Sequence, residues 1–83
     1  MPLNVTVKLF AAYQEAYGQS ELELEVEAGT TVLEIGDRIR AEHPSLKGLA
    51  SITRYGVNLD FVEPSHPVSE GDEIVLIPPV SGG

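Results

Sequence analysis

Hydrophobic and polar residues alternate in two segments of the N-terminal third of the chain. In residues 3–9 the apolar positions are Leu3, Val5, Val7 and Leu9, and the residues between them are polar. In residues 21–28 the apolar positions are Leu22, Leu24, Val26 and Ala28, and they alternate with Glu21, Glu23, Glu25 and Glu27. A period of two residues is typical of a β-strand with one buried face. We therefore expect two strands whose glutamates point to solvent.

Residues 11–17, AAYQEAY, join these two segments and consist mainly of helix formers followed by Gly18. Glycine commonly follows the last residue of a helix, so we expect a short helical turn here. The four glutamates of residues 21–27 have two interpretations. They form a solvated strand face on which like charges discourage edge pairing, which we favour, or a docking surface for a basic partner.

Residues 29–44, GTTVLEIGDRIRAEHP, carry the clearest helical pattern. Thr31 and Glu34 have the spacing of a capping box, and Pro44 ends the helix after His43. The apolar residues that recur along one helix face are Val32, Ile35 and Ile39. This pattern predicts an amphipathic helix that packs on the sheet.

Two further features of this helix concern its stability. Glu34 and Arg38 are four residues apart, a spacing at which opposite charges pair on a helix surface. Gly36 lies in the helix interior, where glycine costs about 1 kcal/mol relative to alanine. We expect close packing of the helix against the sheet to explain this glycine.

The C-terminal half predicts short strands separated by turns. Residues 45–50 are expected to form a loop, and residues 51–62 give weaker strand patterns interrupted by a turn at residues 58–60. Residues 63–67, EPSHP, form another loop, and SEGD at residues 69–72 predicts a turn. The next segment, EIVLI at residues 73–77, is apolar at four successive positions, which is typical of a strand in the middle of a sheet.

The predicted order is strand, strand, helix and further strands, the last of them central. Two hairpin strands, a crossover helix and a strand that returns beside the first give a mixed sheet around one main helix. We therefore predict an α+β protein with the β-grasp, or ubiquitin-like, fold. Residues 1–77 are expected to form the domain, and residues 78–83 an extended tail that ends in Gly-Gly.

Composition narrows the classes of function. The chain has 83 residues, no cysteine, 13 acidic and 5 basic residues, and a net charge of −8. The absence of cysteine excludes disulfides, thiolate metal sites and cysteine nucleophiles. The negative charge disfavours nucleic acids and anionic membranes as partners. Because the sequence also has no apolar run of bilayer length and no signal-peptide pattern, we expect an unprocessed cytoplasmic protein.

Conventional catalytic and metal-binding patterns are absent from the sequence. The two histidines, His43 and His66, each stand beside a proline and are expected to be structural or solvent-exposed. The acidic residues Asp37, Glu42, Asp60 and Glu63 are scattered and fit surface charges better than an acid–base pair. Neither a metal-ligand spacing nor a phosphate-binding glycine loop occurs.

The C-terminal carboxylate is the one unusual chemical group. Pro78 and Pro79 favour an extended backbone, and the six residues from Pro78 to Gly83 span on the order of 20 Å. Gly82 and Gly83 have no Cβ, so they fit a narrow channel in another protein. A carboxylate is a poor electrophile and requires activation, for example by ATP-dependent adenylation, before a sulfur or an amine can attack it.

The segments that carry a family resemblance are GDEIVLIPPVSGG at residues 71–83, VKLFAAYQEAYG at residues 7–18, the capped helix and Val57-Asn58. Together they resemble the small subunits of molybdopterin synthase, which are ubiquitin-like sulfur carriers. Gly36 departs from the bulky apolar residue expected in this helix. The resemblance implies that an E1-like enzyme adenylates Gly83 with ATP and that a persulfide-derived sulfur converts it to a thiocarboxylate.

The resemblance also implies the partner and the acceptor. The tail enters the large subunit of a heterotetrameric synthase and gives sulfur to cyclic pyranopterin monophosphate, while the small subunit alone is not catalytic and binds no cofactor. We expect the partner-binding surface to lie beside the tail, on the side of the sheet opposite the core. Its predicted members are Phe10, Val75, Ile77, Pro78, Pro79, Val80 and Ser81.

Three alternatives remain at the level of the sequence. The same tail chemistry serves sulfur carriers for thiamine or tRNA thiolation, and it serves protein modifiers that are joined to lysines. A different class is a ubiquitin-like binding module whose tail takes part in no reaction. For the docking surface, the alternative is that loops of the same chain cover Val75 and Ile77.

Overall fold

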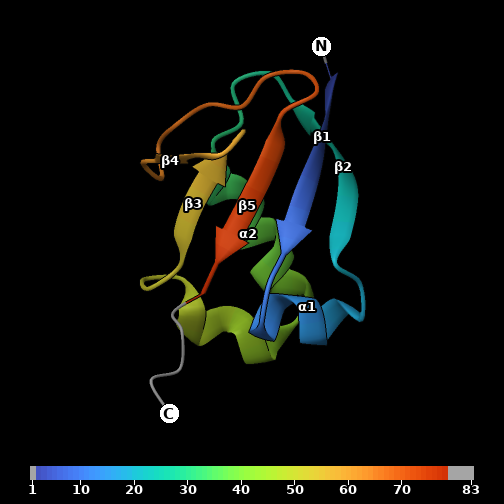
Figure 1. The fold of residues 1–83 in the computed structure, drawn as a ribbon, viewed down its shortest axis with the longest axis vertical. Helices are drawn as coiled ribbons and strands as arrows, with labels where there is room; N and C mark the ends of the chain where they lie inside the picture. Colours follow the sequence, from blue (N-terminus) through green and yellow to red (C-terminus); the bar gives the residue numbers. More distant parts are fainter. Residues whose placement is uncertain (1, 79–83) are drawn as a thin grey trace.

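The computed structural model describes residues 2–78 of the chain. Five strands and two α-helices, together with one 3₁₀ helix, make up this part (Figure 1). In chain order they are β1 (Pro2–Leu9), α1 (Ala12–Tyr17), β2 (Glu21–Glu27), α2 (Val32–Glu42), the 3₁₀ helix η1 (Pro44–Leu49), β3 (Arg54–Val57), β4 (Asp60–Val62) and β5 (Glu73–Ile77).

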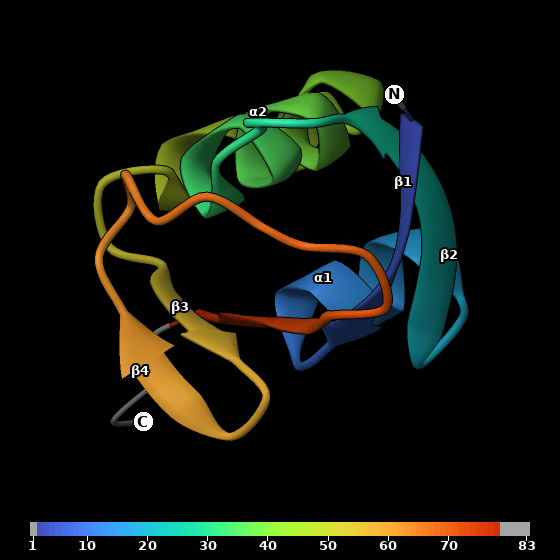
Figure 2. The same cartoon turned by 90° about the horizontal axis from the view of Figure 1, so that it is seen from above.

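The strands form one mixed sheet in the order β2-β1-β5-β3-β4. β1 pairs antiparallel with β2 and parallel with β5, while β3 pairs antiparallel with both β5 and β4. The central position of β5 agrees with its nearly continuous apolar sequence. α2 lies across one face of the sheet (Figure 2), and we call the opposite face the outer face. This architecture confirms the predicted β-grasp fold.

The core lies between α2 and the sheet. Val7, Val32, Ile74 and Leu76 are completely buried. The other buried apolar residues are Val5, Leu9, Tyr13, Val26, Ile35, Ile39, Leu46, Tyr55, Val57 and Val68. The alternation predicted for β1 and β2 is therefore observed, except that Ala28 is exposed because β2 ends at Glu27 and the chain turns there.

The two caps that the sequence predicts, at the start of α2 and at the end of α1, are both observed. The Thr31 hydroxyl accepts a hydrogen bond from the Glu34 N–H at 3.2 Å, and the Glu34 carboxylate accepts from the Thr31 N–H at 2.9 Å. This is a complete capping box. Gly18 follows α1 in the left-handed conformation, with φ of 69°, as a glycine cap does.

Two predictions in this region were wrong. The segment after α2, residues 45–50, is mainly 3₁₀ helix because Pro44 fits the first turn of η1, which begins directly after the α2 cap. Glu34 and Arg38 form no ion pair, since the Glu34 carboxylate is used in the capping box. The Arg38 guanidinium instead donates to the Glu25 carbonyl on β2 at 3.0 Å.

The end of β5 leads toward the predicted tail. Pro78 is buried directly after β5, and residues 79–83 lie outside the part that the structure describes. The division into a domain of residues 1–77 and a tail of residues 78–83 therefore stays a prediction. Within residues 2–78, no helix has the length and apolar character required to cross a membrane.

Candidate functional site

One row of cross-strand neighbours crosses the outer face of the sheet. Gly56 on β3 lies opposite Phe61 on β4 and opposite Val75 on β5. The row continues to Lys8 on β1, which lies opposite Glu21 on β2. Because side chains alternate between the two faces of a strand, these five residues lie on the side away from α2. The row is apolar over β5 and β4 and charged over β1 and β2.

An open apolar hollow occupies the apolar half of this face. Its volume is about 270 Å³, and it is lined by Phe10, Gly56, Leu59, Asp60, Phe61, Val75 and Ile77. Phe10 is 47% exposed and Phe61 is 71% exposed, although both are large and apolar. Gly56 has no side chain to fill the space, and a Cβ there would lie 3.6 Å from the Val75 Cβ. We call these seven residues the outer-face hollow.

The structure brings together three of the predicted docking residues. Phe10, Val75 and Ile77 all line the outer-face hollow, and the last two are half-buried there. Pro78 is buried beside the end of β5. The remaining predicted site residues, Pro79, Val80, Ser81, Gly82 and Gly83, lie outside the described residues, so the prediction of the tail site is not tested.

Leu59 and Phe61 also line the hollow, but their sequence pattern did not identify them as docking residues. They belong to the hairpin of β3 and β4, strands of four and three residues that are too short for a clear period of two. Their relation to Phe10 depends on strand pairing across about half of the chain. The available indication was Phe61 itself, a large apolar residue beside a predicted turn.

Hydrogen bonds fix the β3–β4 hairpin to the start of β5. The Asn58 N–H donates to the Glu73 carbonyl at 2.9 Å, and the Glu73 N–H donates to the Asn58 side-chain oxygen at 3.0 Å. The Asn58 side-chain amide also donates to the Asp72 carboxylate at 2.9 Å. The hairpin that carries Leu59 and Phe61 is therefore held in a defined position relative to Val75.

Charged side chains, most of them acidic, surround the apolar area. Asp60 lines the hollow itself, and the four glutamates of β2 are exposed on the same face. Lys8 lies between the two areas and forms ion pairs with Glu21 at 3.5 Å and Glu73 at 3.8 Å. A partner that covers this face would meet apolar side chains at β5 and β4, bordered by carboxylates and by two cations, Lys8 opposite Val75 and the exposed Arg54 opposite Ile77.

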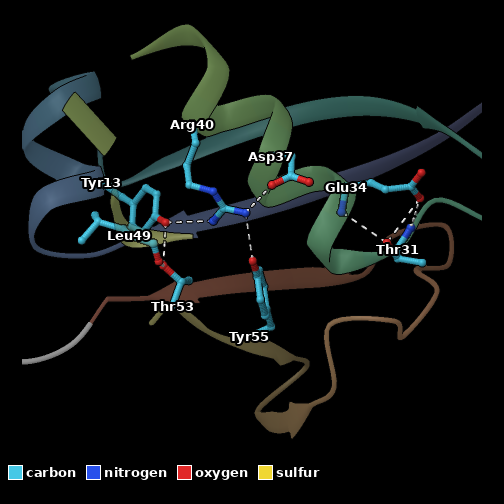
Figure 3. Close-up of polar contacts among 8 residues, drawn as sticks. All are labelled: Tyr13, Thr31, Glu34, Asp37, Arg40, Leu49, Thr53 and Tyr55. Carbon is cyan, nitrogen blue, oxygen red and sulfur yellow. Dashed lines mark hydrogen bonds and ion pairs between the residues drawn. The ribbon is translucent and has the colours of Figure 1, made fainter. Parts of the chain in front are cut away.

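The buried polar centre of the protein lies on the other side of the sheet (Figure 3). Arg40 of α2 is 3% exposed and donates to the hydroxyls of Tyr13 and Tyr55 at 3.0 and 3.1 Å and to the Asp37 carboxylate at 2.7 Å. Burial by itself lowers the pKa of Arg40, but these hydrogen bonds more than offset the effect of burial, and the net pKa is raised. The guanidinium therefore stays charged and connects α2 to α1 and β3.

This polar cluster continues to the 3₁₀ helix. The Thr53 hydroxyl donates to the Leu49 carbonyl at 2.7 Å, so the Tyr13 hydroxyl, 2.7 Å from Thr53, donates to Thr53 and accepts from Arg40. No buried side-chain nitrogen or oxygen within residues 2–78 lacks a hydrogen-bond partner. The cluster is satisfied and, apart from the exposed Asp37, inaccessible to solvent, which fits a structural role and not a catalytic one.

The histidines and carboxylates do not form a site in the described part of the chain. His43 packs edge-on against Tyr17, with ring centroids 4.3 Å apart, and His66 is exposed. Within residues 2–78 no three His, Asp or Glu residues converge as metal ligands would. The hollow is thus the feature of residues 2–78 that is best suited to binding a partner.

The sequence profile of the ThiS family matches residues 7–83 of the chain. The chain belongs to the ThiS family. One relative is similar over nearly the whole chain. The molybdopterin synthase sulfur carrier subunit of Arabidopsis thaliana is 32% identical over 81 residues, covering 98% of this chain and 84% of that protein. The resemblance to small sulfur carrier subunits is therefore confirmed.

Solved structures similar to this ThiS family member have the same fold. The small archaeal modifier protein 1 of Haloferax volcanii superposes with a TM-score of 0.80 at 26% identity, covering 94% of this chain and 99% of that one. The second is a chain from the complex of subunits 1 and 2 of the molybdopterin-converting factor of Helicobacter pylori. Its TM-score is 0.61 at 26% identity, over 98% of this chain and all of that one.

Proposed function

We propose that this protein is the sulfur-carrying small subunit of a molybdopterin synthase, with the carboxylate of Gly83 as the reactive group. The observation that carries the proposal is the family match, which runs through Gly82 and Gly83 in a chain that has no cysteine. Without a thiol, the chain has no side chain on which to carry sulfur, so the sulfur is carried at the terminal carbonyl. The docking surface is the outer-face hollow.

The proposed activation has two steps. A Gly83 carboxylate oxygen attacks the α-phosphorus of ATP, pyrophosphate leaves, and an acyl adenylate forms. A sulfur nucleophile then attacks the carbonyl carbon and AMP leaves. With sulfide the product is the thiocarboxylate directly, whereas a persulfide gives an acyl disulfide that a thiol cleaves to the thiocarboxylate. An E1-like enzyme provides the ATP site, since a chain of net charge −8 repels phosphates.

The proposed transfer takes place on a second protein. The large subunit covers the outer-face hollow, receives the tail, and binds cyclic pyranopterin monophosphate, to which the thiocarboxylate gives its sulfur. The Helicobacter pylori complex supports this arrangement because a similar chain is found there with subunit 2 of the same factor. Under this proposal the small subunit binds no cofactor and supplies one sulfur atom for each activated tail.

The test is an intact-mass measurement after incubation with ATP, an E1-like enzyme and a sulfur donor. The expected product has one oxygen replaced by one sulfur at Gly83, and omission of ATP should prevent the exchange. A variant that lacks Gly82 and Gly83 is the control, and it should keep the thermal stability of the full chain while accepting no sulfur. Retention of partner function by this variant would instead favour a binding module with an inert tail.

A second function within the same chemistry is protein modification. It is supported by the structural similarity to small archaeal modifier protein 1. In that case an amine, instead of sulfur, displaces AMP and joins Gly83 to lysine side chains of other proteins. Isopeptide conjugates would favour this function, co-purification with a large synthase subunit would favour the first, and transfer to a thiamine or tRNA precursor would identify a related carrier.

A further inference from the structure

Leu59 has the least favourable placement of any large apolar residue in the described chain. It is 92% exposed, so no part of residues 2–78 packs on most of its side chain. It also adopts a φ of 78°, in the left-handed region where the Cβ of an L-residue crowds the backbone. Leu59 therefore lowers the stability of the free protein in two ways, through exposed apolar surface and through backbone strain.

The hairpin imposes this backbone geometry. Asn58 and Leu59 are the two residues between paired Val57 and Asp60, and both have positive φ, 49° and 78°. Such a two-residue turn matches the twist of the strands, and its preferred sequence is Asn-Gly. Asn58 fits its position and is held by its hydrogen bonds to Asp72 and Glu73. Leucine occupies the position where glycine would be the most stable choice.

From this placement we infer that Leu59 is an anchor that inserts into an apolar pocket of the large synthase subunit. The inference rests on the proposed function and adds a residue that determines which partner fits. Leu59 lines the rim of the outer-face hollow, so a protein that covers Phe10 and Phe61 also reaches it. Strained residues persist in structures chiefly where they serve binding or catalysis.

The charges around the hairpin indicate the chemistry of the complementary surface. Asp60 follows Leu59 directly and lines the hollow, and the Asp72 carboxylate lies at the other side of the turn, where it accepts a hydrogen bond from the Asn58 side-chain amide. The pocket that receives Leu59 should therefore be apolar inside and carry Lys or Arg side chains at its rim. This combination would exclude large subunits with an acidic or filled surface at that point.

The experiment compares Leu59→Gly with the unchanged full-length protein in thermal unfolding and in binding to the large subunit. Because glycine relieves the strain, the variant should melt at the same temperature or up to roughly 5 °C higher. Because the anchor is lost, its Kd should rise by about tenfold or more. Leu33→Ala on α2, also exposed but on the opposite face, is the matched control and should leave the Kd unchanged.

A second hollow variant, Phe61→Ser, separates this inference from the proposed function. If Phe61→Ser weakens binding and Leu59→Gly changes the Kd less than twofold, the outer-face hollow is the interface but Leu59 is not an anchor. If neither variant affects binding while Gly83 still accepts sulfur, the outer-face hollow is not the interface and the anchor is wrong with it. If Leu59→Gly instead only abolishes self-association, the pocket belongs to a second copy of this chain, which also overturns the inference.

Discussion

At the scale of single residues, the buried cluster around Arg40 explains why glycine occupies position 36, one helical turn away. A Cβ at this position would lie 2.9 Å from a guanidinium nitrogen of Arg40 and 3.0 Å from the Tyr55 hydroxyl. The helix alone would gain about 1 kcal/mol from alanine. We nevertheless expect Gly36→Ala to lower the free energy of unfolding by about 1 kcal/mol or more, because the guanidinium is fixed by its hydrogen bonds and must move.

Urea unfolding of Gly36→Ala, Arg40→Met and the double variant measures this coupling. Once Arg40 is replaced, its two close nitrogens are gone and the Tyr55 hydroxyl, no longer held by the guanidinium, can move away from the added methyl group. The alanine should therefore become neutral or stabilising in the double variant. The two changes should thus deviate from additivity by about 1 kcal/mol or more. Additive effects would show that Arg40 is not the reason for the glycine.

Tyr17 gives a pH-dependent prediction at the same scale. Burial, followed by the hydrogen bond to Glu42, raises the pKa of Tyr17 above its usual range. The folded protein therefore holds this proton more tightly than the unfolded chain, whose tyrosine titrates near pH 10. The corresponding stability is complete below about pH 10 and is lost as the pH rises further.

The variant Tyr17→Phe tests the direction of this pH dependence of stability. It should be less stable than the unchanged protein by about 1 kcal/mol at neutral pH, because the hydrogen bond to Glu42 is lost. The difference should narrow as the pH rises above about 10, where the tyrosine contribution declines. Parallel stability profiles across this interval, measured by urea unfolding, would contradict the assignment.

At the scale of elements, the β3–β4 hairpin has to be held against β5 for the hollow to form. Asn58→Ala removes two side-chain hydrogen bonds and places alanine at a φ of 49°. Thr31→Ala removes the cap of α2, which lies on the opposite face of the sheet. Each change should lower the free energy of unfolding by about 1–2 kcal/mol.

The two variants should differ in partner binding. Asn58→Ala releases the hairpin that carries Leu59 and Phe61, so the Kd for the large subunit should rise several-fold. Thr31→Ala has a similar loss of stability and should leave the Kd unchanged at a temperature where both variants are folded. Equal effects on binding would mean that global stability, and not the position of the hairpin, controls the interface.

The same elements show which parts of the fold can be predicted from the sequence. β1, β2 and α2 are long enough for their periods of two and 3.6 residues to be clear, and the capping box marks where α2 begins. η1 was missed because a 3₁₀ turn has no distinctive apolar period. β3 and β4 gave weak patterns because short strands depend on their neighbours, and for that reason Leu59 and Phe61 were not assigned to the site.

The burial of the charged residue Arg40 could not be predicted from the sequence either. Arg40 lies among polar residues of α2 and has the composition of a surface position, yet it is one of the most buried polar residues described. Its partners come from α1, α2 and β3, so their proximity exists only after the sheet and helix have packed. In contrast, Phe10, Val75 and Ile77 were assigned correctly to one face because strand parity alone determines that face.

At the scale of the whole molecule, the net charge of −8 should control how fast partners associate. The exposed β2 glutamates share the outer face with the hollow, so a basic large subunit would be attracted toward this side of the protein. We expect the association rate to fall by about tenfold or more between roughly 0.05 and 0.5 M salt, because screening shortens the range of this attraction. The dissociation rate should change much less if, as proposed, the apolar hollow provides most of the contact.

A variant in which Glu21, Glu23, Glu25 and Glu27 are all replaced by Gln assigns this effect to β2. Stopped-flow association should be slower for the variant at low salt and equal to that of the unchanged protein at high salt. The control is Phe61→Ser on β4, in the apolar half of the outer face. It should accelerate dissociation without altering the salt dependence of the association rate. If the four-Gln variant keeps the full salt dependence, the attraction comes from other carboxylates, and the β2 glutamates serve only to prevent edge pairing of the sheet.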